Sequence, residues 1–142
     1  MILSLDSNVM IDICNGRDGV RERFDEAVKA GGKIVASPVA SHELLFGCLI
    51  SPRPQHHLDR AQALLADLLI VDMTHEDALV AARIRQDLRR LGRSIGAYDL
   101  LIAGQALNRG WTMVSANLRE YTRVENLRVV DWTRPASHQT ED

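Results

Sequence analysis

The stretch Ile2-Leu3-Ser4-Leu5-Asp6-Ser7-Asn8 decides the fold that we predict for this chain. Its first four residues are mostly apolar and predict a short strand, and Asp-Ser-Asn supplies side chains that favour the start of a helix. Working outward, short apolar strands continue to alternate with helical segments along the chain. This alternation predicts an α/β domain with a mainly parallel sheet that is covered by helices on both faces.

The boundaries of the predicted elements follow from local residue preferences. Pro38 favours the first helical position, Gly110 favours the left-handed position after a helix, and Thr74 with Asp77 forms a variant of the capping box. We predict strands over residues 2–5, 33–36, 68–71, 112–115 and 127–130. We predict helices over residues 17–30, 38–50, 55–67, 76–91, 96–108 and 118–121, in addition to the one that starts after Asp6.

Length and composition describe an ordinary globular protein. With 142 residues, 46% of them apolar and 25% charged, the chain predicts one domain that can bury a core. We expect the domain to span residues 1–133 and a polar, disordered tail to span residues 134–142. The sequence contains no apolar run of membrane-spanning length and no secretory signal, so we expect no membrane contact and a cytoplasmic location.

Most of the basic residues are arginine, and three of the arginines recur at a regular spacing. The net charge of −2 argues against broad non-specific attraction to nucleic acid, but 15 of the 17 basic residues are arginine, which binds phosphate with a planar fork. Arg85, Arg89 and Arg93 recur every four residues and therefore share one helix face. This face is either simply solvated, or it binds an RNA backbone or the acidic side of a partner.

Zinc chemistry is not indicated. Cys14 and Cys48 lack the spacing of a zinc site or a disulfide framework, and we expect both to be buried free thiols. His42-Glu43 begins the His-Glu-x-x-His pattern of zinc proteases, but position 46 is Phe, so the second histidine ligand is missing.

Three acids stand at the starts of helices. Asp6 follows the first strand, Glu43 interrupts an apolar helix start, and Asp99 lies in the first turn of an apolar helix. Each has a structural alternative, because an acid at a helix start caps it or complements its dipole. Acids brought close together raise one another's pKa unless a cation neutralises them, and an oxygen-rich site suits Mg²⁺ or Mn²⁺. The three therefore predict a metal site.

The ordered motifs resemble the PIN-domain ribonucleases, and within them the VapC-type toxins of toxin–antitoxin pairs. The resemblance extends from Met1 to about Trp132 and combines several short motifs. These are Leu5-Asp6-Ser7-Asn8-Val9, Ser41-His42-Glu43-Leu44, Gly96-Ala97-Tyr98-Asp99-Leu100-Leu101-Ile102-Ala103, Val114-Ser115-Ala116-Asn117, Arg119-Glu120-Tyr121-Thr122-Arg123-Val124 and Val130-Asp131-Trp132.

The resemblance implies a three-layer α/β/α domain that uses Mg²⁺ or Mn²⁺ to cleave RNA. It implies that Asp6 and Asp99 hold the metal, with Glu43 as the third catalytic acid. Asn117 stands where many PIN nucleases have a fourth acid, so it is a candidate catalytic position, and Glu120 is the alternative. Asn117 and Glu120 could equally form a capping box.

The resemblance also implies a homodimer that is silenced by a small antitoxin covering the site. The main competing hypothesis is a catalytically silent PIN-like module that binds RNA or protein, and the intact acids argue against it. A DNA nuclease of related architecture stays open. A small-molecule phosphohydrolase is less favoured, because the run after the first strand lacks that group's Asp-x-Asp spacing.

Overall fold

The computed structural model describes the backbone of residues 1–134 and 140–141. The strands are β1 (Ile2–Leu5), β2 (Lys33–Ala36), β3 (Leu69–Ile70), β4 (Thr112–Val114), β5 (Val129–Val130) and β6 (Thr140–Glu141). The helices are α1 (Ser7–Cys14), α2 (Val20–Lys29), α3 (Pro38–Leu49), α4 (Pro54–Ala66), α5 (His75–Arg90), α6 (Ala97–Arg109) and α7 (Leu118–Tyr121).

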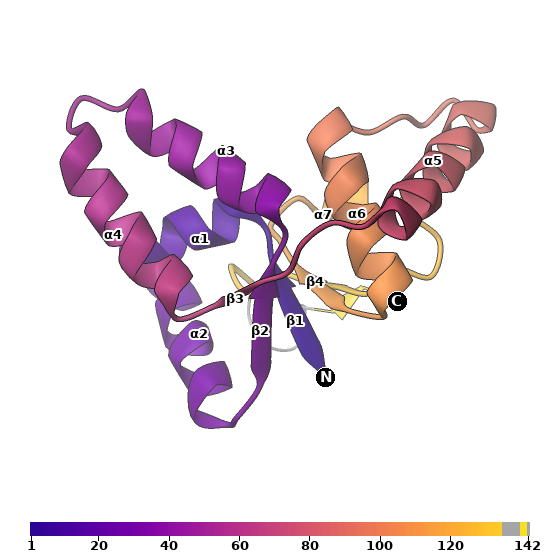
Figure 1. Ribbon diagram of the computed structural model, residues 1–142. Coiled ribbons are helices and arrows are strands. Elements are labelled where there is room, and N and C mark those ends of the chain that lie inside the picture. The colour runs from indigo at the N-terminus through magenta and orange to yellow at the C-terminus, as the bar shows by residue number, and fades with distance from the viewer. Residues whose placement is uncertain (135–139, 142) are drawn as a thin grey trace.

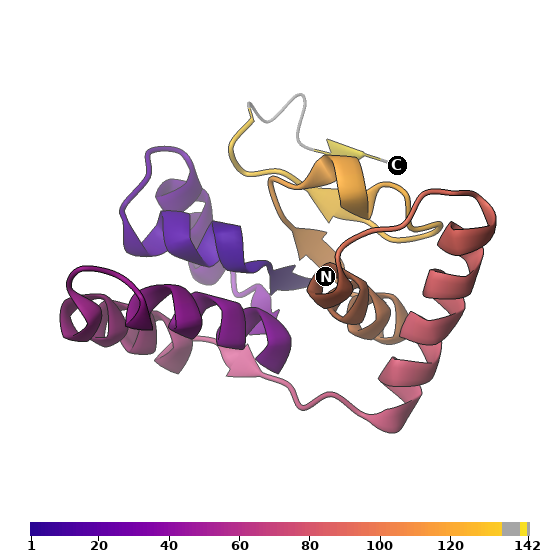
Figure 2. The ribbon, with the colours of Figure 1, turned by 90° about the horizontal axis from the view of Figure 1, so that it is seen from above.

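The strands form one sheet in the order β3-β2-β1-β4-β5-β6, with β1 in the middle. Every pairing from β3 to β5 is parallel, and β6 is antiparallel to β5. Helices α1 to α4 gather on one side of the sheet and α5 and α6 on the other (Figures 1 and 2). The structure thus confirms the predicted three-layer α/β domain with a mainly parallel sheet.

The predicted elements differ from the observed ones mainly at their ends. The helix expected over residues 17–30 begins only at Val20, because Gly19 has a φ of 84° that ends the preceding turn. The strand expected over residues 127–130 is shorter in the structure, where β5 covers only Val129–Val130. Thr140 and Glu141 pair with β5, so these two residues of the tail expected to be disordered join the sheet. Residues 135–139 and 142 of that tail lie outside the described residues.

The start of α5 combines the predicted cap with a buried ion pair. Thr74 and Asp77 form the capping box as expected, and Asp77 is fully buried. Arg109 at the end of α6 donates to the same carboxylate at 2.9 and 3.0 Å. Burial alone would raise the pKa of Asp77, but the hydrogen bonds from Arg109, Asn108 and Thr74 outweigh it and hold that pKa below its ordinary value. Asp77 therefore fastens α5 to α6.

Helices α5 and α6 also approach each other very closely at one glycine. A Cβ atom added to Gly104 of α6 would lie 2.5 Å from Ala81 Cβ and 2.8 Å from Ala81 Cα. Since the obstacle includes backbone, it cannot be relieved by a side-chain rotation. The absence of a side chain at Gly104 therefore sets the distance between the two helices, and with it the position of α6 against the sheet.

The cysteines and the lengths of the helices can also be compared with the predictions from the sequence. Cys14 and Cys48 are both free, as expected. Cys48 is buried as predicted, but Cys14 is only partly buried, so that prediction is wrong for Cys14. Within the described residues, no helix has the length and apolar character needed to cross a bilayer.

We predict that Gly104→Ala destabilises the protein by about 1–3 kcal/mol, because the added methyl group forces α5 and α6 apart. The matched control is Gly47→Ala in the exposed face of α3, where an added Cβ meets nothing within 4 Å. Gly47→Ala should stabilise by up to about 1 kcal/mol through helix propensity. Urea unfolding of both variants measures the difference. Equal effects at the two positions would contradict the packing argument.

Candidate active site

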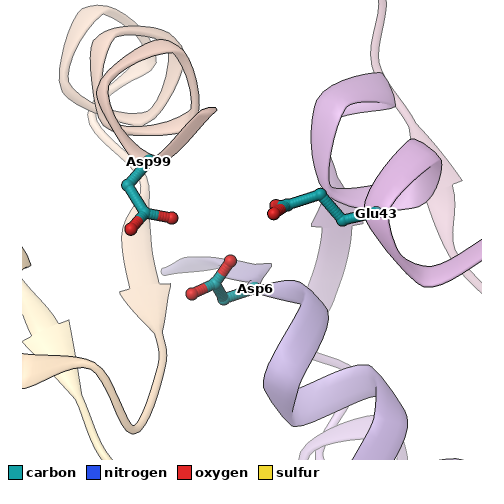
Figure 3. A group of neighbouring side chains, drawn as sticks. All are labelled: Asp6, Glu43 and Asp99. Carbon is teal, nitrogen blue, oxygen red and sulfur yellow. The ribbon is translucent and has the colours of Figure 1, made fainter. Parts of the chain in front are cut away.

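Three acidic side chains converge at the carboxyl edge of the sheet. Asp6 follows β1, Glu43 comes from α3, and Asp99 comes from the first turn of α6. One carboxylate oxygen from each lies within 4.8 Å of the others, and all three side chains point into one space (Figure 3). The structure therefore brings together the three acids that the sequence singled out, from both helical layers and the strand between them.

Asp6 is held by hydrogen bonds on both carboxylate oxygens. The Ser7 backbone N–H donates to Oδ1 at 2.9 Å, and the Ser115 hydroxyl donates to Oδ2 at 2.8 Å. Asp6 is therefore the N-cap of α1 and a member of the acidic site at once. Its side chain is almost completely buried, and this burial raises its pKa although the hydrogen bonds from Ser115 and Ser7 work against the shift.

The position of Asp6 follows from strand pairing. The Asp6 N–H donates to the Val114 carbonyl at 3.0 Å, which extends the pairing of β1 with β4 by one residue. Ser115 follows Val114 directly, so its hydroxyl emerges beside the Asp6 carboxylate. The rule that chemistry gathers at the carboxyl ends of parallel strands could have identified Ser115, but only once β1 and β4 were known to be neighbours.

Asp99 receives two neutral hydrogen bonds. The Tyr121 hydroxyl donates to Oδ1 at 3.2 Å, and the Asn117 amide donates to Oδ2 at 3.2 Å. Burial, the hydrogen bond with Glu120 and the charge of Asp6 together raise the pKa of Asp99 to about 7. The Tyr121 contact could not be predicted from the sequence, because a buried aromatic residue in a helix is usually a core residue.

Glu120 brings a fourth carboxylate to the site. The hydrogen bond with Asp99 lowers the pKa of Glu120, and donors from Asn117 and the Gly96 backbone lower it further. The capping box considered for Asn117 and Glu120 is not formed, because the Asn117 side chain makes no cap hydrogen bond. It donates instead to Glu120 at 3.0 Å and to Asp99.

Glu43 supplies the observation that favours a cation most directly. Its Oε1 atom is buried and has no hydrogen-bond partner among the described residues. Burial and then the charge of Asp6 raise the pKa of this carboxyl group. A buried carboxylate oxygen without a donor is costly unless something positive is bound to it. An all-oxygen set of Asp6, Glu43 and Asp99 suits a hard divalent cation such as Mg²⁺ or Mn²⁺.

The predicted arginine face lies on α5 and in the segment that leads from α5 to α6. Arg85 and Arg89 are exposed on α5, and Arg93 is exposed in the segment after it. Arg85 lines a surface hollow together with Ala97 and Leu100, which flank Asp99 in α6. Arg85 therefore borders the first turns of α6, the helix that carries Asp99. No ion pair involves Arg85, Arg89 or Arg93 within the part of the chain that the structure describes.

Comparison with known proteins adds the family context. The family model described as the PIN domain matches residues 3–127. The chain is 36% identical over 130 residues to the tRNA(fMet)-specific endonuclease VapC of Shigella flexneri, covering 91% of this chain and 96% of that protein. It is 32% identical over 129 residues to the ribonuclease VapC2 of Haemophilus influenzae, covering 90% of this chain and 96% of that protein.

Solved structures show the same similarity. The VapBC2 complex of Rickettsia felis bound to a promoter DNA fragment contains a chain that superposes with a TM-score of 0.87 at 26% identity, covering 93% of this chain and 99% of that one. The DNA-bound VapBC of Salmonella typhimurium contains one with a TM-score of 0.84 at 32% identity, covering 93% and 98%.

We predict that Asp99→Asn stabilises the protein in EDTA at mildly alkaline pH. The pKa of Asp99 rises from 3.8 to about 7 on folding, so its favourable contribution is complete below 3.8 and is lost as the pH rises through about 7. Removing the charge should therefore raise the melting temperature above pH 7, and the gain should vanish below about pH 4. Thermal unfolding across pH measures this.

Asp18→Asn is the matched control, because Asp18 is exposed and outside the site. It should leave the melting temperature nearly unchanged across the same pH range. If Asp99→Asn behaves like Asp18→Asn at alkaline pH, the repulsion inferred for the acidic site is wrong.

Proposed function

Since the chain belongs to the PIN-domain family, we propose that it is an endoribonuclease that acts as the toxin of a toxin–antitoxin pair. The observation that carries the proposal is the convergence of Asp6, Glu43 and Asp99 within 4.8 Å in a chain that matches VapC ribonucleases over nine-tenths of its length. A catalytically silent module would have no use for this arrangement, because packed carboxylates destabilise a protein when nothing neutralises them.

We further propose that the enzyme depends on Mg²⁺ or Mn²⁺. Asp6 and Asp99 would hold the cation, and the unpartnered Oε1 of Glu43 supports its inclusion in the site. Asn117, whose amide donates to Asp99 and Glu120, and Glu120 itself are the candidates for the fourth corner. A bound divalent cation supplies charge stabilisation at the phosphoryl oxygens and lowers the pKa of a water that it binds.

The residues of the chain itself orient the reacting groups. Ser115 and the Ser7 N–H fix the Asp6 carboxylate, while Tyr121 and Asn117 fix that of Asp99. Fixed carboxylates cost no reorganisation when charge develops during phosphodiester hydrolysis. Glu43 Oε1 faces the same space without a donor of its own, so we assign it the role of accepting a hydrogen bond from the attacking water and orienting it.

Arginine side chains support RNA binding despite the overall negative charge. Arg85 lies in the hollow beside Ala97 and Leu100, and Arg89 and Arg93 continue from it on the exposed surface. Exposed guanidinium groups without carboxylate partners are available to phosphate oxygens. A phosphate backbone that runs from these arginines to Asp99 would enter the acidic site from the α5 side.

We also propose the partners that the family similarity suggests. The protein would form a homodimer and be silenced by a small antitoxin that covers the acidic site, since the solved VapBC structures are toxin–antitoxin complexes. Acting on cellular RNA, it would work in the cytoplasm. We propose residues 1–133 as the nuclease domain, in agreement with the extent of the family match over residues 3–127.

We predict that purified protein cleaves RNA in Mg²⁺ or Mn²⁺ and that EDTA abolishes the activity. Asp6→Asn and Asp99→Asn should each lower the rate by more than about 100-fold, because each removes a charged ligand of the cation that would stabilise the transition state. Asp18→Asn, the same chemical change away from the site, should leave the rate unchanged. Gel analysis of a labelled RNA measures the rates. Undiminished cleavage by both site variants would refute the assignment.

We predict that expression of the protein without its antitoxin arrests bacterial growth. Arrest requires RNA cleavage, so Asp99→Asn should restore growth at an equal protein level, whereas Asp18→Asn should not. Growth curves after induction, with immunoblots for protein amount, measure the effect. Normal growth with an active nuclease would rule out the toxin role while leaving the ribonuclease activity intact.

A further inference from the structure

The exposed aromatic residues are confined to one place. The chain contains two residues each of Phe, Tyr and Trp. Trp111, Trp132, Phe24 and Tyr121 are buried in the core. Phe46 and Tyr98, by contrast, are 54% and 51% exposed. A half-exposed large ring contributes little to the core, so the position of these two rings calls for another explanation.

A histidine joins the two exposed rings into one cluster. His42 stacks on Phe46 with a centroid distance of 6.4 Å and an interplanar angle of 15°. It meets Tyr98 edge to face at 5.5 Å and 71°. His42 is itself exposed. The ring cluster of His42, Phe46 and Tyr98 therefore spans from α3 to α6, across the boundary between the two helical layers.

The ring cluster adjoins the acidic site on both helices. His42 precedes Glu43 in α3, and Tyr98 precedes Asp99 in α6, while the Glu43 and Asp99 carboxylate oxygens lie within 4.8 Å of each other. Gly96 and Ala97, which precede Tyr98, are small and exposed. A nucleotide whose phosphate lies at the carboxylates would therefore have its base beside these rings.

We propose that the ring cluster is a stacking surface for an unpaired base next to the cleaved phosphate. The inference rests on the proposed ribonuclease function and assigns His42, Phe46 and Tyr98 a role in binding the substrate. Flat aromatic side chains bind unpaired bases by stacking, and they tolerate different bases because every base offers a π face. A base held in a duplex is already stacked on its neighbours and cannot occupy the cluster.

Contact with another protein molecule is the competing use of this surface. Leu49 and Ile50 are exposed beyond Phe46 at the end of α3 and continue its apolar character. The adjacency of His42 and Tyr98 to Glu43 and Asp99 favours RNA, because the two rings lie on the turns of α3 and α6 that carry the acids and not at the far end of α3. The oligomeric state of the ring-cluster variants therefore distinguishes this use from RNA binding.

The test compares binding of two single strands to protein made inactive by Asp99→Asn. One is a short unstructured RNA with a fluorescent label, and the other is an abasic ribose–phosphate chain of the same length and label. We expect the RNA to bind on the order of 10-fold more tightly than the abasic chain, from the stacking of one base. Adding Tyr98→Leu should remove this difference, and Tyr98→Phe should retain it because stacking does not need the hydroxyl.

Two controls separate the alternatives. Leu79→Ala removes an exposed apolar side chain of α5 and should leave the preference for RNA unchanged. Equal binding of both chains, or an equal loss for both after Tyr98→Leu, would overturn the stacking surface. A smaller sedimentation coefficient after Tyr98→Leu or Phe46→Leu would likewise overturn it in favour of a protein interface. Because this assay needs no cleavage, its failure is distinct from a failure of the parent protein to cut RNA.

Discussion

Three carboxylate oxygens lie within 4.8 Å of one another at the carboxyl edge of the sheet, and the surrounding structure has to oppose their repulsion. Parallel pairing supplies the first restraint, because β1 and β4 place Asp6 and Ser115 side by side. The second restraint is the packing of α6, whose first turn carries Asp99. A close contact at Gly104 and the buried Asp77–Arg109 pair hold that helix against α5. The acidic site thus depends on contacts that lie outside it.

The acids that lie wholly or partly inside the protein differ in the charge of their hydrogen-bond donors, and their pKa values shift in opposite directions. Asp77 faces the Arg109 guanidinium, and its pKa lies below the ordinary value. Asp6 and Asp99 receive hydrogen bonds from neutral groups, and their pKa values are raised. Among the described residues, no arginine or lysine forms an ion pair with Asp6, Glu43 or Asp99. Asp77 and Asp131 thus have an arginine partner within the chain, whereas Asp6, Glu43 and Asp99 form no ion pair among the described residues, which supports the proposal that they bind a cation from solution.

The sequence predicted most of the fold because the relevant information is local. Pro38, the Thr74 and Asp77 capping box and the left-handed Gly110 act through neighbouring residues and appear where expected. Asp6 and Asp99 were also predictable, since each stands at a helix start. Glu43 was expected near a helix start but lies beyond the first turn of α3, so only its place in an apolar stretch marked it. The hydrogen-bond partners of the acids were not predictable. Tyr121 donates to Asp99 across 22 positions, and Arg109 reaches Asp77 across 32, so both depend on how the layers pack.

Glu120 shows where local reasoning is ambiguous. Asn and Glu three residues apart match both a capping box and a pair of site residues, and sequence alone cannot separate the two. The structure resolves the ambiguity through Asp99, because the Asn117 amide donates to both carboxylates and leaves the helix end uncapped. The Asn117 side chain thus bonds to neighbouring carboxylates in place of capping α7. Such departures from local helix preferences are expected at functional sites.

The first turn of α6 carries both an acid of the site, Asp99, and a ring of the exposed cluster, Tyr98. Successive residues of a helix point about 100° apart, so Asp99 can face the other carboxylates while Tyr98 faces outward to His42. The same holds for Glu43 and His42 on α3. Any movement of α6 relative to α3 would therefore change the spacing of the carboxylates and the contact between the rings together. On the proposed function, a base bound at the ring cluster would be in position only when the acids are also in position, so base binding and cleavage would depend on the same packing of α3 and α6.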